Sequence, residues 1–273
     1  MADYKILIVN PNTTKSMTDA LIPIVESLGY ANVTLTAKQS RRLQLTHRKQ
    51  TNHTFWTAPT GPSSINNQED CHKSASECFP HLQPLIPSYD AFLIACYSHH
   101  PLVALMMHEA DHKPVLGIFE ASITTAIQLL TNDRDAKDDG KFGIVTTGKV
   151  WENLLTEAVL WRLGGGIGIE GEGKENSNSN SNSNSNSTFK GVESTGLNAT
   201  ELHDAPQEEV RAKVQDAARK LTRDGDVKVV VLGCAGMAGM DEWIREVVPE
   251  KVRIVDGVKA GVGGLQTLLR GRF

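Results

Sequence analysis

The most restrictive feature of this sequence is an unbroken apolar run that ends in a cysteine. Residues 229–233 read Val-Val-Val-Leu-Gly and lead directly into Cys234. A β-branched run without alternation predicts a strand that is buried on both faces, as in a parallel sheet. The run Ala91–Ala95 repeats this arrangement and ends at Cys96. We therefore expect two central parallel strands, each of which delivers a thiol to the carboxyl edge of its sheet.

Strand and helix patterns alternate along most of the chain. Lys5–Val9 predicts a strand, and the side-chain oxygens of the Asn10–Thr14 loop suit the start of a helix that stops at Gly29. The same order of pieces begins again at Phe142–Val145, which leads into a second loop with hydroxyl groups and another helix. Two βα units with the same order of parts indicate related halves of the chain.

A third matched piece supports an internal duplication. The predicted strand over 252–257 and the helix after it correspond to residues 116–130, so that Asp256 stands roughly where Glu120 stands. Strands that alternate with helices form parallel sheets, whose ligands bind at the carboxyl ends of the strands. The predicted fold class is therefore α/β, with two similar lobes, each a parallel sheet flanked by helices, and an active site in the cleft between them.

The duplication also predicts the extent of each lobe. We expect the first lobe to span 1–118 and to include the C-terminal strand and helix, at about 250–273. The second lobe is expected to span 119–249. The charged residues 133–141 form a candidate hinge between the halves.

Three stretches fit the repeated pattern less well. Residues 33–37 alternate and are β-branched, which predicts a second strand. Residues 41–87 have no clear pattern and predict a long excursion over the surface, with one helix near 68–79. Residues 174–188 are almost pure Asn-Ser alternation, which predicts a disordered insertion because such a segment has nothing to bury.

Composition excludes several classes of partner. The chain has 28 basic and 32 acidic residues, and its net charge of −4 offers no basic field for a nucleic acid or an anionic membrane. No apolar run approaches the thickness of a membrane, and the N-terminal one is too short for a secretion signal. The four cysteines are few for this length, and a reducing cytosol would keep them as thiols. We expect a cytoplasmic protein whose partner is a small-molecule substrate, and self-association into a homo-oligomer stays open.

The pair of strand-end cysteines predicts acid–base chemistry. A single free cysteine is often only a packing residue, but Cys96 and Cys234 recur at equivalent positions. The amides of a following helix N-terminus can lower a thiol pKa from about 8.5 toward neutrality. One thiolate and one thiol on opposite sides of a small molecule form a base and an acid.

The loops beside the cysteines offer candidate binding groups. Asn10, Thr146 and Thr147 provide an amide and hydroxyl groups that could hold carbonyl or carboxylate oxygens, although simple helix capping explains each of them equally well. Backbone amides near Ala235 and Gly236 could stabilise an enolate as it forms. We expect these groups, together with Ser98, Tyr97 and Glu120, to surround the substrate.

Other motifs carry weaker signals. Cys71-His72 with Cys78 and His81 could be offered as a zinc site, but a paired CxxC is missing. The pair His99-His100 could tune the Cys96 thiol or form an exposed turn. The sequence contains neither a Walker loop nor a GxGxxG motif, so no nucleotide is expected.

Several of these motifs together resemble a known family. They are Ile8–Thr14 with Met17 and Thr18, the strand into Cys96, Gly117–Ala121, Val145–Thr147 and Leu232–Met237. In combination they resemble the hydantoin racemase family of the aspartate/glutamate racemase superfamily, which includes allantoin racemases. The resemblance covers most of the chain except 41–87 and the Asn-Ser insertion.

The resemblance implies a cofactor-independent racemase built from two α/β lobes. One cysteine of each lobe would act on the 5-carbon of a hydantoin-type ring, either a 5-substituted hydantoin or allantoin, and Cys96 and Cys234 match the two catalytic positions. The chain departs from bacterial members after Cys96: Tyr97–Pro101 reads Tyr-Ser-His-His-Pro, where they usually continue with a Phe-Gly-Asp-Pro type sequence. This departure is similar to that of the fungal branch, and it bears on the substrate more than on the two thiols.

Two alternatives remain open from the sequence. A related member of the superfamily could use one cysteine, as a nucleophile in a cis-trans isomerase or as a proton donor in a decarboxylase. A noncatalytic metabolite-binding protein would use the threonine loops for an anion and the cysteines only for packing.

Overall fold

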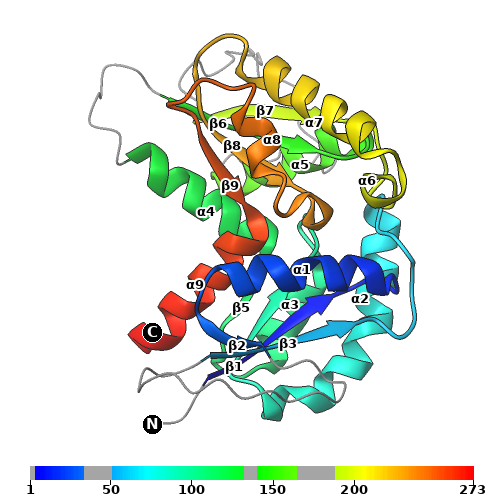
Figure 1. Cartoon of the computed structure of the whole chain (residues 1–273). Helices are drawn as coiled ribbons and strands as arrows, with labels where there is room; N and C mark the ends of the chain where they lie inside the picture. The colour runs from blue at the N-terminus through cyan, green and yellow to red at the C-terminus, as the bar shows by residue number, and fades with distance from the viewer. Residues whose placement is uncertain (1–3, 34–50, 132–139, 165–187) are drawn as a thin grey trace, which may run out of the picture.

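The computed structural model describes residues 4–33, 51–131, 140–164 and 188–273. It contains two parallel sheets, stacked as two lobes (Figure 1). The first sheet has the order β2 (Ala31–Val33), β3 (Thr51–Thr57), β1 (Tyr4–Asn10), β4 (Ala91–Ile94) and β5 (Val115–Gly117). The second has the order β7 (Phe189–Ser194), β6 (Lys141–Thr146), β8 (Val227–Gly233) and β9 (Arg253–Asp256). The predicted fold class is thereby confirmed.

Helices cover both faces of each sheet. In chain order the α-helices are α1 (Lys15–Ser27), α2 (Gln68–Leu82), α3 (Pro101–Glu109), α4 (Ile118–Thr131), α5 (Val150–Arg162), α6 (Glu201–Asp204), α7 (Gln207–Thr222), α8 (Asp241–Arg245) and α9 (Gly257–Gly271). Two 3₁₀ turns, η1 (Gln83–Ser88) and η2 (Ala235–Met237), complete the described elements. The helices predicted after the first strand, after the second loop with hydroxyl groups and after the C-terminal strand are present as α1, α5 and α9.

The alternation of side chains along each central strand divides the core into three clusters. In β1, Ile6 and Ile8 face the space between the lobes, whereas Leu7 and Val9 pack outward against α2 and α3. In β8, Val229 and Val231 face inward, whereas Val230 and Leu232 pack against α7. The inward-facing cluster is continuous from one sheet to the other. The strands therefore read as unbroken apolar runs because both of their faces are buried.

The chain crosses between the lobes twice, at neighbouring points. After β5 it enters α4, which packs against β8 and β9 of the second sheet, and after β9 it enters α9, which packs against α1, β4 and β5 of the first. A Cβ atom added to Gly257 would lie 3.2 Å from the carbonyl oxygen of Ile118, so the two crossings touch. Figure 1 shows α4 and α9 together on one side of the junction.

One part of the expected lobe assignment is wrong. The C-terminal strand β9 was placed in the first lobe, but it forms a parallel ladder with β8 in the second sheet, with Val231 opposite Val255. Only α9 returns to the first sheet. The chain therefore leaves the second lobe after β9 rather than before it, and the remaining lobe boundaries stay a prediction.

The structure also contains strands that lack a clear sequence signal. Residues 51–57 form β3, which lies between β2 and β1, so this part of the expected surface excursion is wrong. The helix expected near 68–79 is confirmed as α2. The edge strand β7 follows the Asn-Ser segment and pairs with β6. The expected strand over 33–37 is described only at Val33, while most of the candidate hinge and all but the last residue of the Asn-Ser segment lie outside the described residues.

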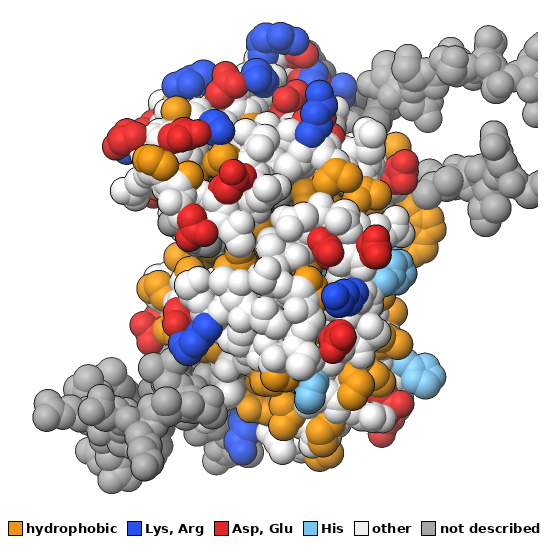
Figure 2. All heavy atoms as spheres, turned by 90° about the vertical axis from the view of Figure 1, so that its right-hand side faces the viewer, with side chains coloured by type: hydrophobic (Ala, Val, Ile, Leu, Met, Phe, Trp, Pro, Cys, Tyr) orange, Lys and Arg blue, Asp and Glu red, His pale blue; other side chains and the backbone are white. Residues whose placement is uncertain are grey.

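Surface charges agree with the composition. Figure 2 shows acidic and basic side chains intermingled on one face, without a large area of a single sign. Within the described part of the chain, no helix has the length and apolarity needed to cross a membrane.

The buried position of β3 brings polar groups into the core. The Thr51 hydroxyl donates to Gln266 Oε1 of α9 at 3.0 Å. His53 is 1% exposed, and its Nε2 finds no hydrogen-bond partner among the described residues. Burial disfavours the charged imidazolium and lowers the pKa of His53 to about 4. His53 is therefore mostly neutral in the folded protein above about pH 4.

We expect this histidine to make the fold sensitive to acid. Below the unfolded-state pKa of about 6.5 the unfolded chain binds a proton that folded His53 refuses until the pH approaches 4, so stability falls by about 1.4 kcal/mol per pH unit across this window. Urea unfolding at pH 7.0, 6.0 and 5.0 measures the slope, which His53→Leu should reduce. The exposed control His108→Leu should keep the wild-type slope; equal slopes in all three proteins would contradict this account.

Candidate active site

Cys96 and Cys234 line a common cavity between the lobes. The Ala95 amide donates to the Val9 carbonyl oxygen at 2.8 Å, so strand-like pairing continues past β4 to the residue before Cys96. Cys234 directly follows β8. Both side chains are partly exposed, and they face a narrow space of about 50 Å³. The two strand ends therefore deliver their thiols to one place from two different sheets.

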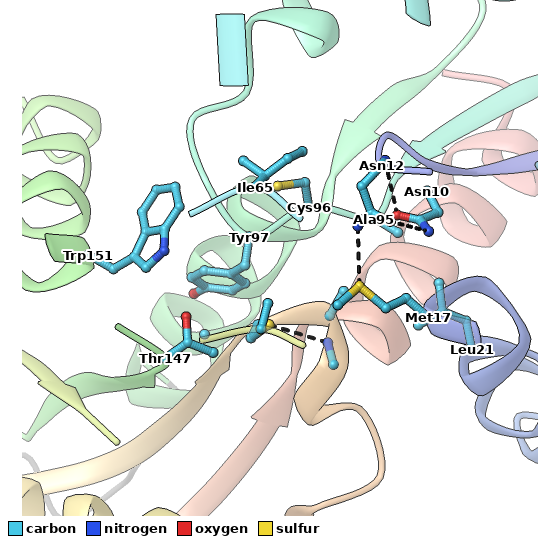
Figure 3. Close-up of a pocket in the computed structure, with 15 residues that line it drawn as sticks. Asn10, Asn12, Met17, Leu21, Ile65, Ala95, Cys96, Tyr97, Thr147 and Trp151 are labelled. Carbon is cyan, nitrogen blue, oxygen red and sulfur yellow. Dashed lines mark hydrogen bonds between the residues drawn. The ribbon is translucent and has the colours of Figure 1, made fainter. Parts of the chain in front are cut away.

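The walls of this narrow cavity come from both lobes (Figure 3). The first lobe contributes Asn10, Asn12, Met17, Leu21, Ile65, Ala95, Cys96 and Tyr97, and the second contributes Thr147, Trp151, Ala199, Gly233, Cys234, Ala235 and Gly236. Among the residues predicted from the sequence, Ser98, Glu120 and Thr146 are not part of these walls. Ser98 contacts Cys96 and Cys71, the Glu120 carboxylate contacts His99, and the Thr146 hydroxyl donates to the Gly233 carbonyl oxygen at the end of β8.

Cys234 is held by the turn that follows it. The Gly236 amide donates to Cys234 Sγ at 3.4 Å, and the Met237 amide donates to the Cys234 carbonyl oxygen at 3.0 Å. Asp256 Oδ2 accepts from the Gly239 amide at 3.1 Å, which ties the end of this turn to the start of α9. The loop that carries the thiol is thus anchored to the crossing between the lobes.

Cys96 has two polar neighbours outside the narrow cavity. Ser98 Oγ lies 3.5 Å from Cys96 Sγ, and Cys71 Sγ donates to the same hydroxyl oxygen at 3.5 Å. Cys71 belongs to α2 and is 3% exposed. Three sulfur and hydroxyl groups therefore form one cluster on the first-lobe side of the site.

The expected lowering of the thiol pKa is wrong for both cysteines. Amides of the η2 turn lower the pKa of Cys234, but burial outweighs them and raises this pKa to about 11. The neighbouring Cys71 and burial raise the pKa of Cys96. The sequence predicted full helix N-termini beside the thiols, whereas η2 is a three-residue turn and α3 begins only at Pro101. Without a helix dipole aimed at the sulfur, loss of hydration dominates.

The Asn10–Thr14 loop is organised mainly by its own side chains. Asn10 Nδ2 donates to Asn12 Oδ1 at 3.0 Å and to the Thr18 hydroxyl at 2.9 Å. Asn12 Oδ1 accepts from the Thr14 amide at 2.9 Å. Thr14 is the N-cap of α1 without a side-chain capping bond. Asn10 therefore shapes the loop from within while one of its faces lines the cavity.

In the second loop with hydroxyl groups, Thr146 and Thr147 have different roles. Thr146 is 1% exposed, and its hydroxyl donates to the Gly233 carbonyl oxygen at 2.9 Å, next to Cys234. A Cβ at Gly233 would lie 2.6 Å from Ile144 Cγ2 and 2.8 Å from the Val145 carbonyl oxygen, so only glycine fits there. Thr147 lines the cavity, and Figure 3 shows its hydroxyl directed toward the side on which Tyr97 and Trp151 lie. Thr146 positions the strand end, and Thr147 is available to a ligand.

Glu120 and the two histidines form a separate group beside Ser98. Glu120 Oε1 lies 3.3 Å from His99 Nδ1, and this contact raises the pKa of His99. His100 is 2% exposed and caps α3 by accepting the Leu102 amide on Nδ1 at 3.2 Å. Within the described residues, neither histidine forms a hydrogen bond with a cysteine sulfur. Their positions indicate support of the loop rather than direct tuning of Cys96.

A wider cavity of about 460 Å³ lies on the other side of this loop. Trp151 lines both cavities, so they meet at its ring. One wall is the apolar face of α5, formed by Trp151, Leu154, Leu155, Ala158 and Trp161. The opposite wall is more polar and includes Gln68, Cys71, His72, Ser98 and His99. Exposed side chains such as Trp161, at 55%, border this cavity, so it reaches the surface.

The suggested zinc motif does not assemble. Cys71 and Cys78 are buried on one face of α2, whereas His72 and His81 are exposed. Across the described ranges, no group of three or more potential metal ligands comes together. Cys78 instead contacts the Pro11 carbonyl oxygen and the Ser74 hydroxyl.

Several wall residues were absent from the sequence prediction. Met17 and Leu21 were interpreted only as packing residues of α1, and Trp151 lies in the first turn of a helix that was predicted but not connected with the site. Ile65 and Cys71 lie in the stretch without a clear pattern. Ala199 follows the unpredicted strand β7 and carries no local signal at all.

Comparisons with known proteins show the family and the fold of this chain. The family model described as Asp/Glu/Hydantoin racemase matches residues 6–264. An uncharacterized protein of Schizosaccharomyces pombe is 33% identical over 97% of this chain and 92% of its own length. A hydantoin racemase of a Pseudomonas species is 23% identical over 97% of this chain and 86% of its own length. The structure of an allantoin racemase from Pseudomonas fluorescens superposes with a TM-score of 0.69, at 23% identity, over 98% of this chain and 92% of that one, and shares the fold.

The Thr146–Gly233 bond generates a test of the cysteine placement. Thr146→Val keeps the shape but removes the hydroxyl, so the end of β8 loses a buried hydrogen bond worth about 1 kcal/mol. We expect turnover to fall by about tenfold, because misplacement of a reacting group by a fraction of an ångström is costly. Thr222→Val removes a similar hydroxyl that donates to the Ala218 carbonyl oxygen at 2.8 Å, far from the cavity. Both variants should lose similar stability in urea, and equal turnover in the two would exclude this role for Thr146.

Proposed function

Because the chain belongs to the Asp/Glu/hydantoin racemase family, it is an isomerase of the racemase class, and we propose that it inverts the 5-carbon of a hydantoin-type ring. The substrate would be a 5-substituted hydantoin or allantoin, and the reaction would need no cofactor. Cys96 and Cys234 would transfer the protons. The names of a hydantoin racemase and an allantoin racemase among the similar proteins support this substrate class.

The observation that carries the proposal is the convergence of two thiols on one cavity. Cys96 comes from the first sheet and Cys234 from the second, and both line the same narrow space. Inversion at carbon requires removal of a proton from one face and delivery of another to the opposite face. Two acid–base groups on separate lobes satisfy this requirement, whereas one cysteine does not.

The proposed reaction follows from the chemistry of the ring. The hydrogen on the 5-carbon lies next to a carbonyl group, so one thiolate removes it as an enolate forms. The Thr147 hydroxyl and the backbone at Ala235 line the cavity and support stabilisation of the enolate oxygen, while the Gly236 amide donates to Cys234 Sγ. In comparable enzymes one such donor contributes about 2.7–4 kcal/mol. The thiol of the other cysteine then protonates the opposite face, and the two cysteines exchange roles for the other enantiomer.

Entry of a substrate requires the lobes to move. A space of about 50 Å³ is about a third of the roughly 150 Å³ found for an engineered cavity that binds benzene, so it is too small for a substituted ring. In the described part of the chain, the backbone passes between the lobes only at Gly117–Ile118 and Asp256–Gly257. These adjacent crossings would allow a small hinge motion that opens the cavity and closes it over the ring.

Replacement of each cysteine tests the two-thiol mechanism. Cys96→Ser and Cys234→Ser should each lower racemisation of a 5-substituted hydantoin by at least about 10³-fold, because a serine hydroxyl is too weakly acidic to take over the proton transfer. Polarimetry measures the rate. Cys78→Ser, which removes a buried thiol outside both cavities, should retain activity. Full activity in either of the first two variants would end the proposal.

Deuterated water distinguishes this mechanism from its rivals. With two thiols, deuterium should appear in the product enantiomer before it appears in the recovered starting enantiomer. A covalent adduct in mass spectrometry would favour a single nucleophilic cysteine, and release of carbon dioxide from a malonate would favour a decarboxylase. Ligand binding that persists without both thiols, in the absence of any turnover, would favour a noncatalytic binding protein.

The wider cavity supports a bulky substituent on the ring. Its α5 wall is apolar and aromatic, so burial of a phenyl-sized group there would contribute about 1.5–3 kcal/mol. Ala158→Trp should fill this space and lower kcat/KM for 5-benzylhydantoin about 10- to 100-fold relative to that for 5-methylhydantoin. Leu160→Trp, on an exposed position of the same helix, is the matched control and should leave the ratio unchanged. An unchanged ratio in Ala158→Trp would place the substituent elsewhere.

A further inference from the structure

A third thiol stands behind Cys96, and the proposed function leaves it without a role. Cys71 Sγ and Cys96 Sγ each lie 3.5 Å from Ser98 Oγ. Cys96 lines the narrow cavity between the lobes, whereas Cys71 and Ser98 line the wider cavity that reaches the surface. The three groups therefore form a continuous hydrogen-bonded path from the site of reaction to an opening at the surface.

A two-thiol racemase needs such a path between turnovers. Suppose that Cys96 has taken the substrate proton and Cys234 has given one. The enzyme then holds a thiol at Cys96 and a thiolate at Cys234, which suits only the reverse reaction. To convert a second molecule of the same enantiomer, a proton must leave Cys96 and another must reach Cys234. Direct exchange is slow where the sulfur is buried, so a relay to the surface would matter most for Cys96.

We propose that Cys71 resets Cys96 between turnovers by accepting its proton through the Ser98 hydroxyl. In this step the Cys96 S–H proton moves to Ser98 Oγ as the Ser98 O–H proton moves to the Cys71 thiolate. The products are a Cys96 thiolate, an unchanged Ser98 and a Cys71 thiol, so charge and atoms balance and nothing is oxidised. The Cys71 thiol then releases its proton into the wider cavity when no substrate fills it. This inference rests on the proposed function.

The directions of the hydrogen bonds are those expected after the transfer. The Cys71 thiol donates to Ser98 Oγ, which leaves the hydroxyl proton of Ser98 free to point at Cys96 Sγ and to stabilise a thiolate there. The pKa shifts of the two cysteines describe the state before the transfer. Hydrogen bonds from Cys96 and Ser98 lower the pKa of Cys71, while Cys71 and burial raise the pKa of Cys96. Before transfer the charge of a singly ionised cluster therefore lies on Cys71, so a thiolate acceptor is present. The transfer itself runs uphill, from the stronger base Cys96 to the weaker base Cys71, and loss of the Cys71 proton into the wider cavity completes it.

Other titratable groups border the cluster without replacing its members. Asp70 and His72 flank Cys71 on α2, and the Asp70 carboxylate opposes ionisation of Cys71. His99 and Glu157 lie on the wall of the wider cavity, and Cys234 lies across the narrow one. Within the described residues, the Ser98 hydroxyl lies 3.5 Å from Cys96 Sγ, and Cys71 is the other neighbour that acts on this thiol. A relay through another side chain would need a contact that the described residues do not make.

The test is the kinetics of the free enzyme. When reset is slow, saturating substrate traps the enzyme in the wrong protonation state, so net racemisation slows at high substrate concentration. In the same regime, labelled product is converted back to substrate while unlabelled substrate is still being converted to product. Cys71→Ser keeps the size and hydrogen bonding of the side chain but removes its acidity. With 5-methylhydantoin, whose small substituent does not fill the wider cavity, we expect this variant to show both effects with kcat at least tenfold lower and kcat/KM within about threefold of the wild-type value. Millimolar imidazole, a small base that can enter the wider cavity, should restore kcat.

Controls separate this relay from a structural role and from the proposed function itself. Cys78→Ser, on the same helix, should behave as wild type. Ser98→Ala interrupts the path without touching Cys71 and should reproduce the Cys71→Ser kinetics, which covers the case in which Cys71→Ser folds poorly. Wild-type kcat in both Cys71→Ser and Ser98→Ala, or a low kcat without imidazole rescue and without trapping, would overturn the relay. Absence of racemisation of every hydantoin by the wild-type enzyme would instead overturn the proposed function.

Discussion

The contact between the two lobe crossings is the constraint on which the rest of the structure depends. Because the backbone at Gly257 meets the carbonyl of Ile118, α4 and α9 begin at the same point and diverge onto opposite sheets. Each crossing starts at the carboxyl end of a strand, so the carboxyl edges of both sheets are brought face to face. The Tyr97 ring lies against the same glycine, and its hydroxyl bonds to Ser122 at 2.9 Å, which connects the Cys96 loop to this junction. The cavity is therefore a direct consequence of how the chain changes lobes.

Burial fixes the positions of the two thiols and also makes their ionisation harder. The loops that carry the thiols are fixed by backbone amides and buried hydroxyls, and both cysteines are only partly exposed. The same removal from water raises the pKa of both thiols, so a thiolate has to be produced within the protein rather than supplied by bulk solvent at neutral pH. Local groups that share protons with the sulfurs are one physical solution to this problem. The cluster of Cys71, Ser98 and Cys96 is placed where such a solution would act.

Much of the fold could be predicted because the central strands have both faces buried. A residue in such a strand is apolar on either side of the sheet, so β1, β4, β6 and β8 stand out as unbroken runs, and their strand ends identified Cys96 and Cys234. Strands β3 and β7 lack this signal: Thr51–Thr57 is polar or aromatic at most positions, and Phe189–Ser194 is an edge strand that is buried only at Phe189. Their places in the sheets depend on hydrogen bonds to neighbours that are distant in sequence. No local pattern of residues specifies those partners.

The sequence by itself determined the class of fold, the order of the βα units and the two strand ends that carry thiols, because hydrophobic periodicity and chain order are properties of the residues alone. The tertiary structure decided which lobe β9 joins, which of the predicted polar residues reach the cavity, and that Cys71 stands behind Cys96. It also decided the sign of the pKa shifts. Proximity and burial depend on groups that fold in from other parts of the chain, and the field at a sulfur atom is the sum of all of them.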